Sequence, residues 1–133
     1  MNHDNVEIAR RAYEAGTRRP QPDFATVNAL YDPDHELVTP LSRLEGTTYR
    51  GAAGFRKWLG SRPEDWESLT FRIDDARAID EERVLLVATF TGRGRRGGVQ
   101  VEQQQGLLVT VREGRVVRTE AYNSVDEATA AAG

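Results

Sequence analysis

Cysteine is absent from this 133-residue chain, and histidine occurs only twice. Without thiols the protein can form no disulfide, thiolate nucleophile, iron–sulfur cluster or cysteine-ligated zinc site. The chain also lacks any run approaching the ~18 apolar residues of a membrane helix. Its first residues lack the cationic and then apolar order of a signal peptide. We therefore expect a cytoplasmic protein with no segment in the membrane.

Positive charge is also in short supply. The 18 basic residues are outnumbered by 21 acidic ones, which gives a net charge of −3. Broad binding to polyanions needs clustered positive potential, so nucleic acid is not an expected partner. Gly92, Gly94 and Gly97 satisfy the spacing G-x-G-x-x-G. That fingerprint binds a dinucleotide only where a helix follows to receive the pyrophosphate, and here a strand pattern follows.

Metal-binding motifs are missing as well. The nearest group of possible ligands is Asp32, Asp34, His35 and Glu36, and the other histidine is His3. Neither an H-E-x-x-H helix nor an EF-hand spacing occurs. Asp32 and Asp34 are typical turn residues, so we expect no metal and no cofactor.

What the chain has is an ordinary globular composition, 38% hydrophobic and 29% charged. Its length suits one domain, which we expect to cover residues 1–133. Helical periodicity predicts helices over residues 5–16 and 23–31. A turn at 32–34, a strand over 35–39 and a loop from Pro40 should follow. A third helix should begin near Gly51 and carry Phe55, Trp58 and Leu59.

From Leu69 onward the pattern alternates with a period of two. It predicts four antiparallel strands over residues 69–79, 83–92, 99–112 and 115–123, the last two joined by a tight turn at Glu113 and Gly114. Ser124 and Glu127 form a capping box before an alanine-rich terminal helix. Helices followed by a meander indicate an α+β fold with helices packed on one face of a sheet.

Three segments and the spacing between them carry a family resemblance. They are ALYDPDHELVTP, YRGAAGFRKWL and VREGRVVRTEAYNSVDEATAAAG. In these segments the chain resembles the SnoaL-like branch of the nuclear transport factor 2-like superfamily. The resemblance implies a cystatin-like, cone-shaped α+β barrel in which helices close a curved mixed or antiparallel sheet. It also implies a central pocket for a small molecule and a homodimer formed through the outer sheet face.

Strand alternation predicts which side chains enter that pocket. Burying unpaired charge is costly, so the faces free of Arg118, Glu120 and Glu102 should point inward. The resemblance adds the face of His35, Leu37 and Thr39. The facing of strands 70–79 and 83–92 stays open because one bulge would invert it. The predicted lining comprises Leu37, Thr39, Trp58, Gln103, Gln105, Leu107, Val109, Val117 and Thr119, with Asn123 at the strand end.

The catalytic groups of the related ketosteroid isomerases are a carboxylate base, a tyrosine and a protonated acid. By resemblance, the base falls at Thr39 and the acid near Leu107, so both carboxyl groups are missing. Their tyrosine falls within a residue of Tyr13. The base of the related polyketide cyclases falls near Asn123, whose amide can orient a substrate but cannot accept its proton. His35 is then the inward proton acceptor, and the catalytic candidates are His35, Tyr13 and Asn123.

Three functions fit these features. The chain binds a small, largely apolar metabolite; or it is a cyclase, isomerase or hydratase with a non-standard base such as His35; or it is a non-catalytic dimerisation module with a vestigial pocket. An open cavity would favour the first function and a sealed interior the third. Five outward residues should form the dimer contact: Glu102, Leu108, Arg118, Glu120 and Tyr122.

Overall fold

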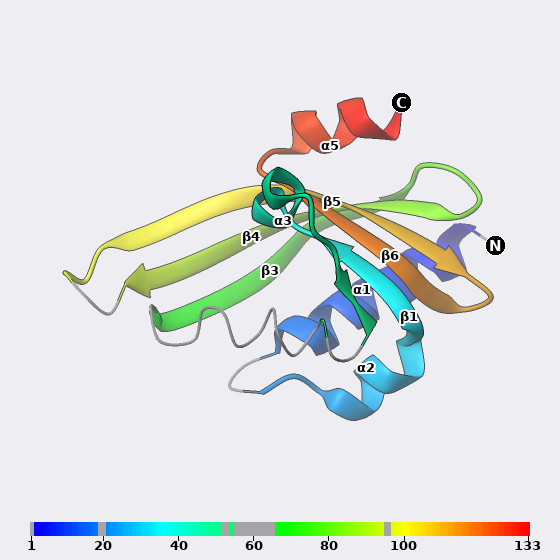
Figure 1. Ribbon diagram of the computed structural model, residues 1–133, viewed down its shortest axis with the longest axis horizontal. Coiled ribbons are helices and arrows are strands. Elements are labelled where there is room, and N and C mark those ends of the chain that lie inside the picture. The colour runs from blue at the N-terminus through cyan, green and yellow to red at the C-terminus, as the bar shows by residue number, and fades with distance from the viewer. Residues whose placement is uncertain (1, 19–20, 52–53, 55–65, 95–96) are drawn as a thin grey trace.

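The computed structural model describes residues 2–18, 21–51, 54, 66–94 and 97–133. Its elements are α1 (Asn2–Thr17), α2 (Phe24–Leu30), β1 (Tyr31–Val38), α3 (Pro40–Glu45), β2 (Tyr49–Arg50), β3 (Trp66–Ala78), β4 (Arg83–Gly94), β5 (Gln100–Arg112), β6 (Arg115–Tyr122) and α5 (Val125–Ala132). In Figure 1 a curved sheet separates α1 and α2 on one side from α5 on the other. We call these the helix face and the outer face of the sheet.

The six described strands form one mixed sheet in the order β2-β1-β6-β5-β4-β3. Strands β3 to β6 form the predicted antiparallel meander, and β1 runs parallel to β6. The β5–β6 turn is tight: Glu113 and Gly114 have φ values of 52° and 78°, which suit a two-residue hairpin. The α+β prediction is confirmed, and the curved sheet remains open, with β2 and β3 at its edges.

The main core lies between α1 and the helix face. Ala9 and Ala12 of α1 are both 1% exposed, so small side chains let the helix approach the sheet closely. The residues packed with them alternate along β4 and β5, which settles the facing of β4 that the sequence left open. They are Val84, Leu86 and Ala88 of β4, Leu107, Val109 and Val111 of β5, and Val116 and Ala121 of β6.

A second, smaller apolar cluster lies on the outer face beneath α5. Leu85, Val87 and Leu108 pack there against Ala128. Gly106 makes this docking possible, because a Cβ atom at its position would lie only 2.6 Å from the Cβ of Ala128. The predicted cap of this helix is present, since the backbone N–H of Glu127 donates to Ser124 Oγ at 3.1 Å.

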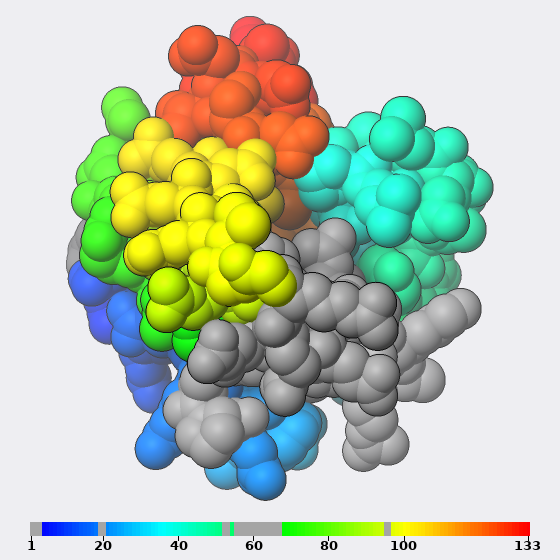
Figure 2. Space-filling model, turned by 90° about the vertical axis from the view of Figure 1, so that its left-hand side faces the viewer, coloured from blue at the N-terminus to red at the C-terminus, as the bar shows by residue number. Residues whose placement is uncertain are grey.

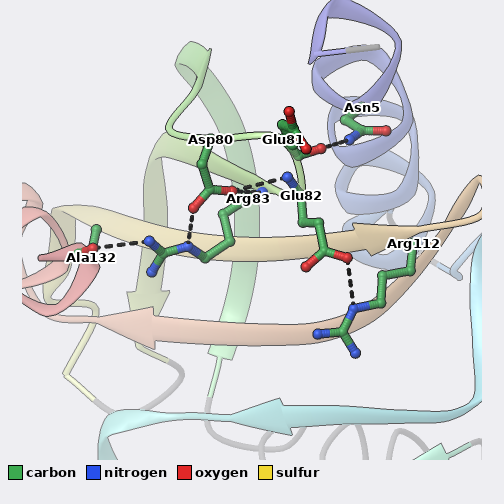
Figure 3. Close-up of polar contacts among 7 residues, drawn as sticks. All are labelled: Asn5, Asp80, Glu81, Glu82, Arg83, Arg112 and Ala132. Carbon is green, nitrogen blue, oxygen red and sulfur yellow. Dashed lines mark hydrogen bonds and ion pairs between the residues drawn. The ribbon is translucent and has the colours of Figure 1, made fainter.

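The turn between β3 and β4 connects both ends of the described chain (Figure 3). The Asn5 amide of α1 donates to the carbonyl of Glu81 at 2.8 Å. The guanidinium of Arg83 bonds Asp80 at 2.8 Å and donates to the carbonyl of Ala132 at the end of α5 at 3.0 Å. Arg83 thus places a cation at a helix C-terminus, where the helix dipole favours it.

Three local predictions were wrong. Strand β1 begins at Tyr31 rather than after the expected turn, although the Asp34 N–H does donate to the Asp32 carboxylate at 2.9 Å. The expected loop from Pro40 contains helix α3, which is capped by Thr39. The third error is the inward position of Val117. The β5–β6 register shifts between Thr110 and Val111, and this bulge places Val116, with 0% exposure, in the core instead.

The predicted helices over 5–16 and 23–31 are present as α1 and α2. The prediction of Phe55, Trp58 and Leu59 on a third helix lies outside the described residues. Within the described ranges, no helix is both long and apolar enough to cross a membrane.

Candidate functional site

A row of aromatic rings runs across the helix face from β1 to β3. The Tyr31 and His35 rings have centroids 4.7 Å apart. Tyr13 of α1 meets Phe71 of β3 edge to face at 6.4 Å, and Phe71 lies 6.3 Å from Phe90 of β4. The two halves meet where α1 crosses the sheet, since the Tyr31 hydroxyl donates to the carbonyl of Ala12, next to Tyr13, at 3.2 Å. We call Tyr13, Tyr31, His35, Phe71 and Phe90 the aromatic row.

A hollow of about 400 Å³ opens at the β3 end of the aromatic row. It lies between the last turns of α1 and the edge strand β3, and we call it the α1–β3 hollow. Tyr13, Phe71 and Ile73 supply its apolar wall. Thr17, Thr70, Glu14 and Arg18 supply the polar part. Figure 2 shows a separate surface depression at one end of the molecule, between β5 (yellow) and the segment containing α3 (cyan).

His35 lies at the opposite end of the row and is 4% exposed. Burial lowers the pKa of its imidazole, because the charged form loses water, while the carboxylate of Asp32 acts in the opposite direction. The ring is therefore neutral at pH 7 and can accept a proton. The structure thus places the predicted base in an environment that keeps it unprotonated.

Tyr13 and Tyr31 are the phenol groups of the row. Burial raises the pKa of both hydroxyls, and the nearby Tyr13 phenol raises that of Tyr31 further. Both remain protonated at neutral pH and can donate a hydrogen bond. Sequence reasoning identified Tyr13 but missed Tyr31, which it assigned to the end of a helix.

Part of the predicted pocket lining does lie on the helix face. Leu107, Val109 and Thr119 are buried there, and Thr119 pairs with both Leu37 and Val109 across the sheet. On β5, register pairs Gln103 with Phe90 and Gln105 with Ala88, so the two half-buried amides share the face of the aromatic row.

The remaining predicted residues have other positions. The hydroxyl of Thr39 accepts from the Ser42 N–H at 3.0 Å, and the Ser42 hydroxyl accepts from the Thr39 N–H at 2.8 Å. Thr39 therefore caps α3. Asn123 is exposed, and its backbone carbonyl accepts from the Gln103 amide at 3.3 Å. Trp58 lies outside the described residues. Phe71, Ile73 and Phe90 were missed because the facing of β3 and β4 was left open.

The outer face carries the residues predicted for a dimer contact. Leu108 points outward as expected, but α5 covers it and leaves it 2% exposed. Beside α5, Glu36 bonds Arg118 at 2.7 Å and Arg50 at 2.5 Å, and Arg118 lies 3.4 Å from Glu120. In the described part of the chain, no group of three histidine, aspartate or glutamate side chains could hold a metal ion.

An open, curved sheet of six described strands, with α1 and α2 on one face, α5 on the other and a hollow beside α1, is an α+β fold of the nuclear transport factor 2-like, cystatin-like class. The chain belongs to the SnoaL-like domain family, whose profile matches residues 9–119. An uncharacterised protein of Mycobacterium tuberculosis is 25% identical to it over 126 residues, which cover 94% of this chain and 92% of that protein.

Two solved structures illustrate the similarity. A protein from Jannaschia sp. assigned as a SnoaL-like polyketide cyclase superposes with a TM-score of 0.74 at 15% identity, covering 98% of this chain and 92% of that one. TerC, co-crystallised with polyporic acid, superposes with a TM-score of 0.75 at 20% identity, covering 97% and 98%. At these identities both establish the fold alone.

Proposed function

We propose that this protein binds a small, largely apolar metabolite between α1 and the helix face of the sheet. The observation that carries the proposal is the α1–β3 hollow, whose volume of about 400 Å³ is within the usual ~300–1,000 Å³ of ligand pockets. The hollow opens directly on the Tyr13 and Phe71 rings, which would supply flat apolar contact area.

The polar groups of the aromatic row suit an uncharged part of such a ligand. The Tyr13 phenol and the His35 imidazole are both neutral at pH 7. The Tyr13 phenol, which lines the hollow, can exchange a hydrogen bond with a ligand without the large desolvation cost of a buried charge. The complex of the structurally similar TerC with polyporic acid supports small-molecule binding by this fold. An open hollow also favours binding over a non-catalytic dimerisation module.

Native mass spectrometry of the protein against a library of aromatic and alicyclic metabolites tests this proposal, followed by calorimetric titration of each hit. Phe71→Ala removes one wall of the hollow and should weaken binding by about tenfold or more. Phe24→Ala is the matched control, because Phe24 is 47% exposed on α2 and does not line the hollow. Equal affinity of wild type and Phe71→Ala would place the ligand elsewhere.

A second candidate function, catalysis by proton abstraction, is favoured by the burial of His35. A neutral imidazole against Tyr31 could serve as general base for an isomerase, cyclase or hydratase. His35→Ala should then abolish any turnover found in a metabolite screen. His35→Gln, which retains a hydrogen-bonding group but takes up no proton at neutral pH, should be equally inactive. Turnover unchanged in either variant would eliminate His35 as the base.

We also propose that a homodimer forms through the part of the outer face that α5 leaves open. The alternating charges of Glu36, Arg118 and Glu120 would suit a two-fold contact, in which each patch meets its own copy. Light scattering at micromolar concentration should give twice the mass of one chain. A monomeric mass would rule the dimer out.

A further inference from the structure

Two hollows adjoin along α1, and the same two charged side chains line both. The second hollow, of about 270 Å³, shares Glu14 and Arg18 with the α1–β3 hollow. Glu14 and Arg18 therefore stand where the two hollows meet, beside the apolar wall formed by Tyr13, Phe71 and Ile73. The other residues that line the second hollow are Arg11, Ala15, Asp23 and Thr26.

Glu14 lies near the end of α1, and Arg18 directly follows the last helical residue, Thr17, so the two charges are close in sequence but do not share the helix surface. Here each has a different and distant partner. A Glu14 oxygen lies 3.9 Å from Arg10, and an Arg18 nitrogen lies 4.0 Å from Asp23. The same Asp23 oxygen already accepts the Thr26 hydroxyl at 2.7 Å. Both charges are held loosely and can turn to a ligand.

Exposure supports the same conclusion. The side chains of Glu14 and Arg18 are 60% and 68% exposed, so little rearrangement is needed to reach them from solvent. The lining of the two hollows is balanced, with Arg11 and Arg18 against Glu14 and Asp23. A ligand that carried only a carboxylate would meet Glu14, and one that carried only an ammonium would meet Arg18. Like charges that come close together repel, so a ligand with a single charge is disfavoured at this place.

We infer that the ligand is an amino-acid-like zwitterion with an apolar side chain. Its carboxylate lies on the Arg18 guanidinium, its ammonium lies beside Glu14, and its apolar body enters the α1–β3 hollow against Tyr13 and Phe71. The charged head of the ligand would take the place of the long contacts that Glu14 and Arg18 make with Arg10 and Asp23. This inference rests on the proposed binding function and names the chemical class of its ligand.

The expected contribution of each charge is modest because both side chains are exposed. Exposed ion pairs change an equilibrium by about two- to fivefold each. Both together should tighten binding by about five- to twentyfold over the same apolar body without charges, and added salt should reduce the gain.

Four indole compounds with the same apolar body test the inference by titration calorimetry. L-tryptophan carries both charges, indole-3-propionate only the carboxylate, tryptamine only the ammonium, and 3-methylindole neither. Tryptophan should bind tightest, by about five- to twentyfold over 3-methylindole. Arg18→Gln should weaken tryptophan while strengthening tryptamine, because a repulsive cation is removed. Glu14→Gln should weaken tryptophan while strengthening indole-3-propionate.

The opposite effects on singly charged probes separate recognition from damage to the fold, since a misfolded hollow would lose all four compounds. Arg77→Gln and Glu113→Gln are control substitutions of exposed charges outside both hollows and should leave all affinities unchanged. If tryptophan binds no tighter than 3-methylindole, or if the two variants leave its affinity unchanged, the inference is overturned while the binding function stands. If no indole probe binds at millimolar concentration, the inference is overturned. The Phe71→Ala comparison on library hits then decides the binding function separately.

Discussion

The two faces of the sheet both bury apolar residues, but they are covered in different ways. On the helix face, α1 lies over a broad core and leaves a hollow beside β3. On the outer face, a helix of eight residues covers a small cluster and fits closely because Gly106 lies beneath Ala128. The helix face has accessible space beside α1, whereas α5 packs closely onto the outer face at Gly106, which is why we place ligand binding on the helix face.

Polar groups differ between the faces in the same way. On the outer face Asp74 accepts hydrogen bonds from Thr89, Gln104 and Arg72, and these contacts lower the pKa of its carboxyl group to about 2. The partners come from β3 itself, β4 and β5, so this polar group is satisfied within the sheet. On the helix face Tyr13 lines a hollow instead. Polar groups that face accessible space are available to a ligand.

The largest expected effect compares one buried leucine from each face. Leu86 is 0% exposed in the helix-face core and Leu108 is 2% exposed beneath α5. Leu86→Ala should lower the free energy of unfolding by about 3–5 kcal/mol, since the rigid surroundings leave a cavity. Leu108→Ala should cost about 2–3 kcal/mol, because the short helix above it can move inward. Urea denaturation of both variants measures the difference, and equal losses would contradict a rigid helix face and an adaptable outer face.

The next effect concerns the contact between Gly106 and α5. A Cβ atom at Gly106 would lie 2.6 Å from the Ala128 Cβ and 3.0 Å from the Ser124 carbonyl oxygen. Gly106→Ala should therefore cost about 1–3 kcal/mol by overpacking. Ala128→Gly removes the opposing methyl group at a cost of about 1 kcal/mol in helix propensity.

The double variant should be more stable than the sum of the two single effects predicts, because Ala128→Gly removes the methyl group that the new Cβ atom at residue 106 would meet. Denaturation midpoints of the four proteins in the cycle measure this coupling. Strict additivity would mean that α5 does not dock at Gly106.

The sequence was sufficient to predict most of the regular elements and the facing of β5. Period-two alternation predicted the meander and the inward Leu107 and Val109, and the distribution of charge on the strands gave the correct facing of β5. The bulge that exchanges Val116 and Val117 has no local signal, since both residues are valine. Helix α3 did have one: a threonine cap followed by proline at the first helical position is a typical helix start.

The aromatic row, too, could be predicted from the sequence only in part. His35 and Tyr13 could be found as chemical groups, but the contact of His35 with Tyr31 depends on an irregular register between Tyr31 and Glu36. The Tyr13 contact with Phe71 depends on where α1 crosses the sheet. Tertiary packing decides both, and no pattern within one segment encodes them.

A smaller effect concerns the pH dependence that His35 adds to the helix face. The folded-state pKa of His35 lies below its unfolded value of about 6.5, so protons bind preferentially to the unfolded chain. Its contribution to stability is complete above pH 6.5 and is lost as the pH falls below that value. The free energy of unfolding should therefore decline between pH 7 and pH 5 in wild type and decline less in His35→Gln. An imidazole titration midpoint above 6.5 by NMR would reverse the sign.

The smallest effect belongs to Asp80 on the turn between β3 and β4. Hydrogen bonds from the Arg83 guanidinium and from the backbone N–H groups of Glu82 and Arg83 lower the pKa of its carboxyl group to about 2. Since the unfolded value is about 3.9, the stabilisation is complete above that pH and is lost as the pH falls through about 2. Protonation of the Asp80 carboxylate would weaken its hydrogen bond with Arg83, whose guanidinium also donates to the carbonyl of Ala132 at the end of α5. Between pH 4 and pH 2 the urea midpoint of Asp80→Asn should therefore fall less than that of wild type. The control is Asp75→Asn, which removes another exposed aspartate paired with an arginine, and its urea midpoint should follow that of wild type. Parallel curves for wild type and Asp80→Asn would show that the turn does not stabilise the docking of α5 on the outer face.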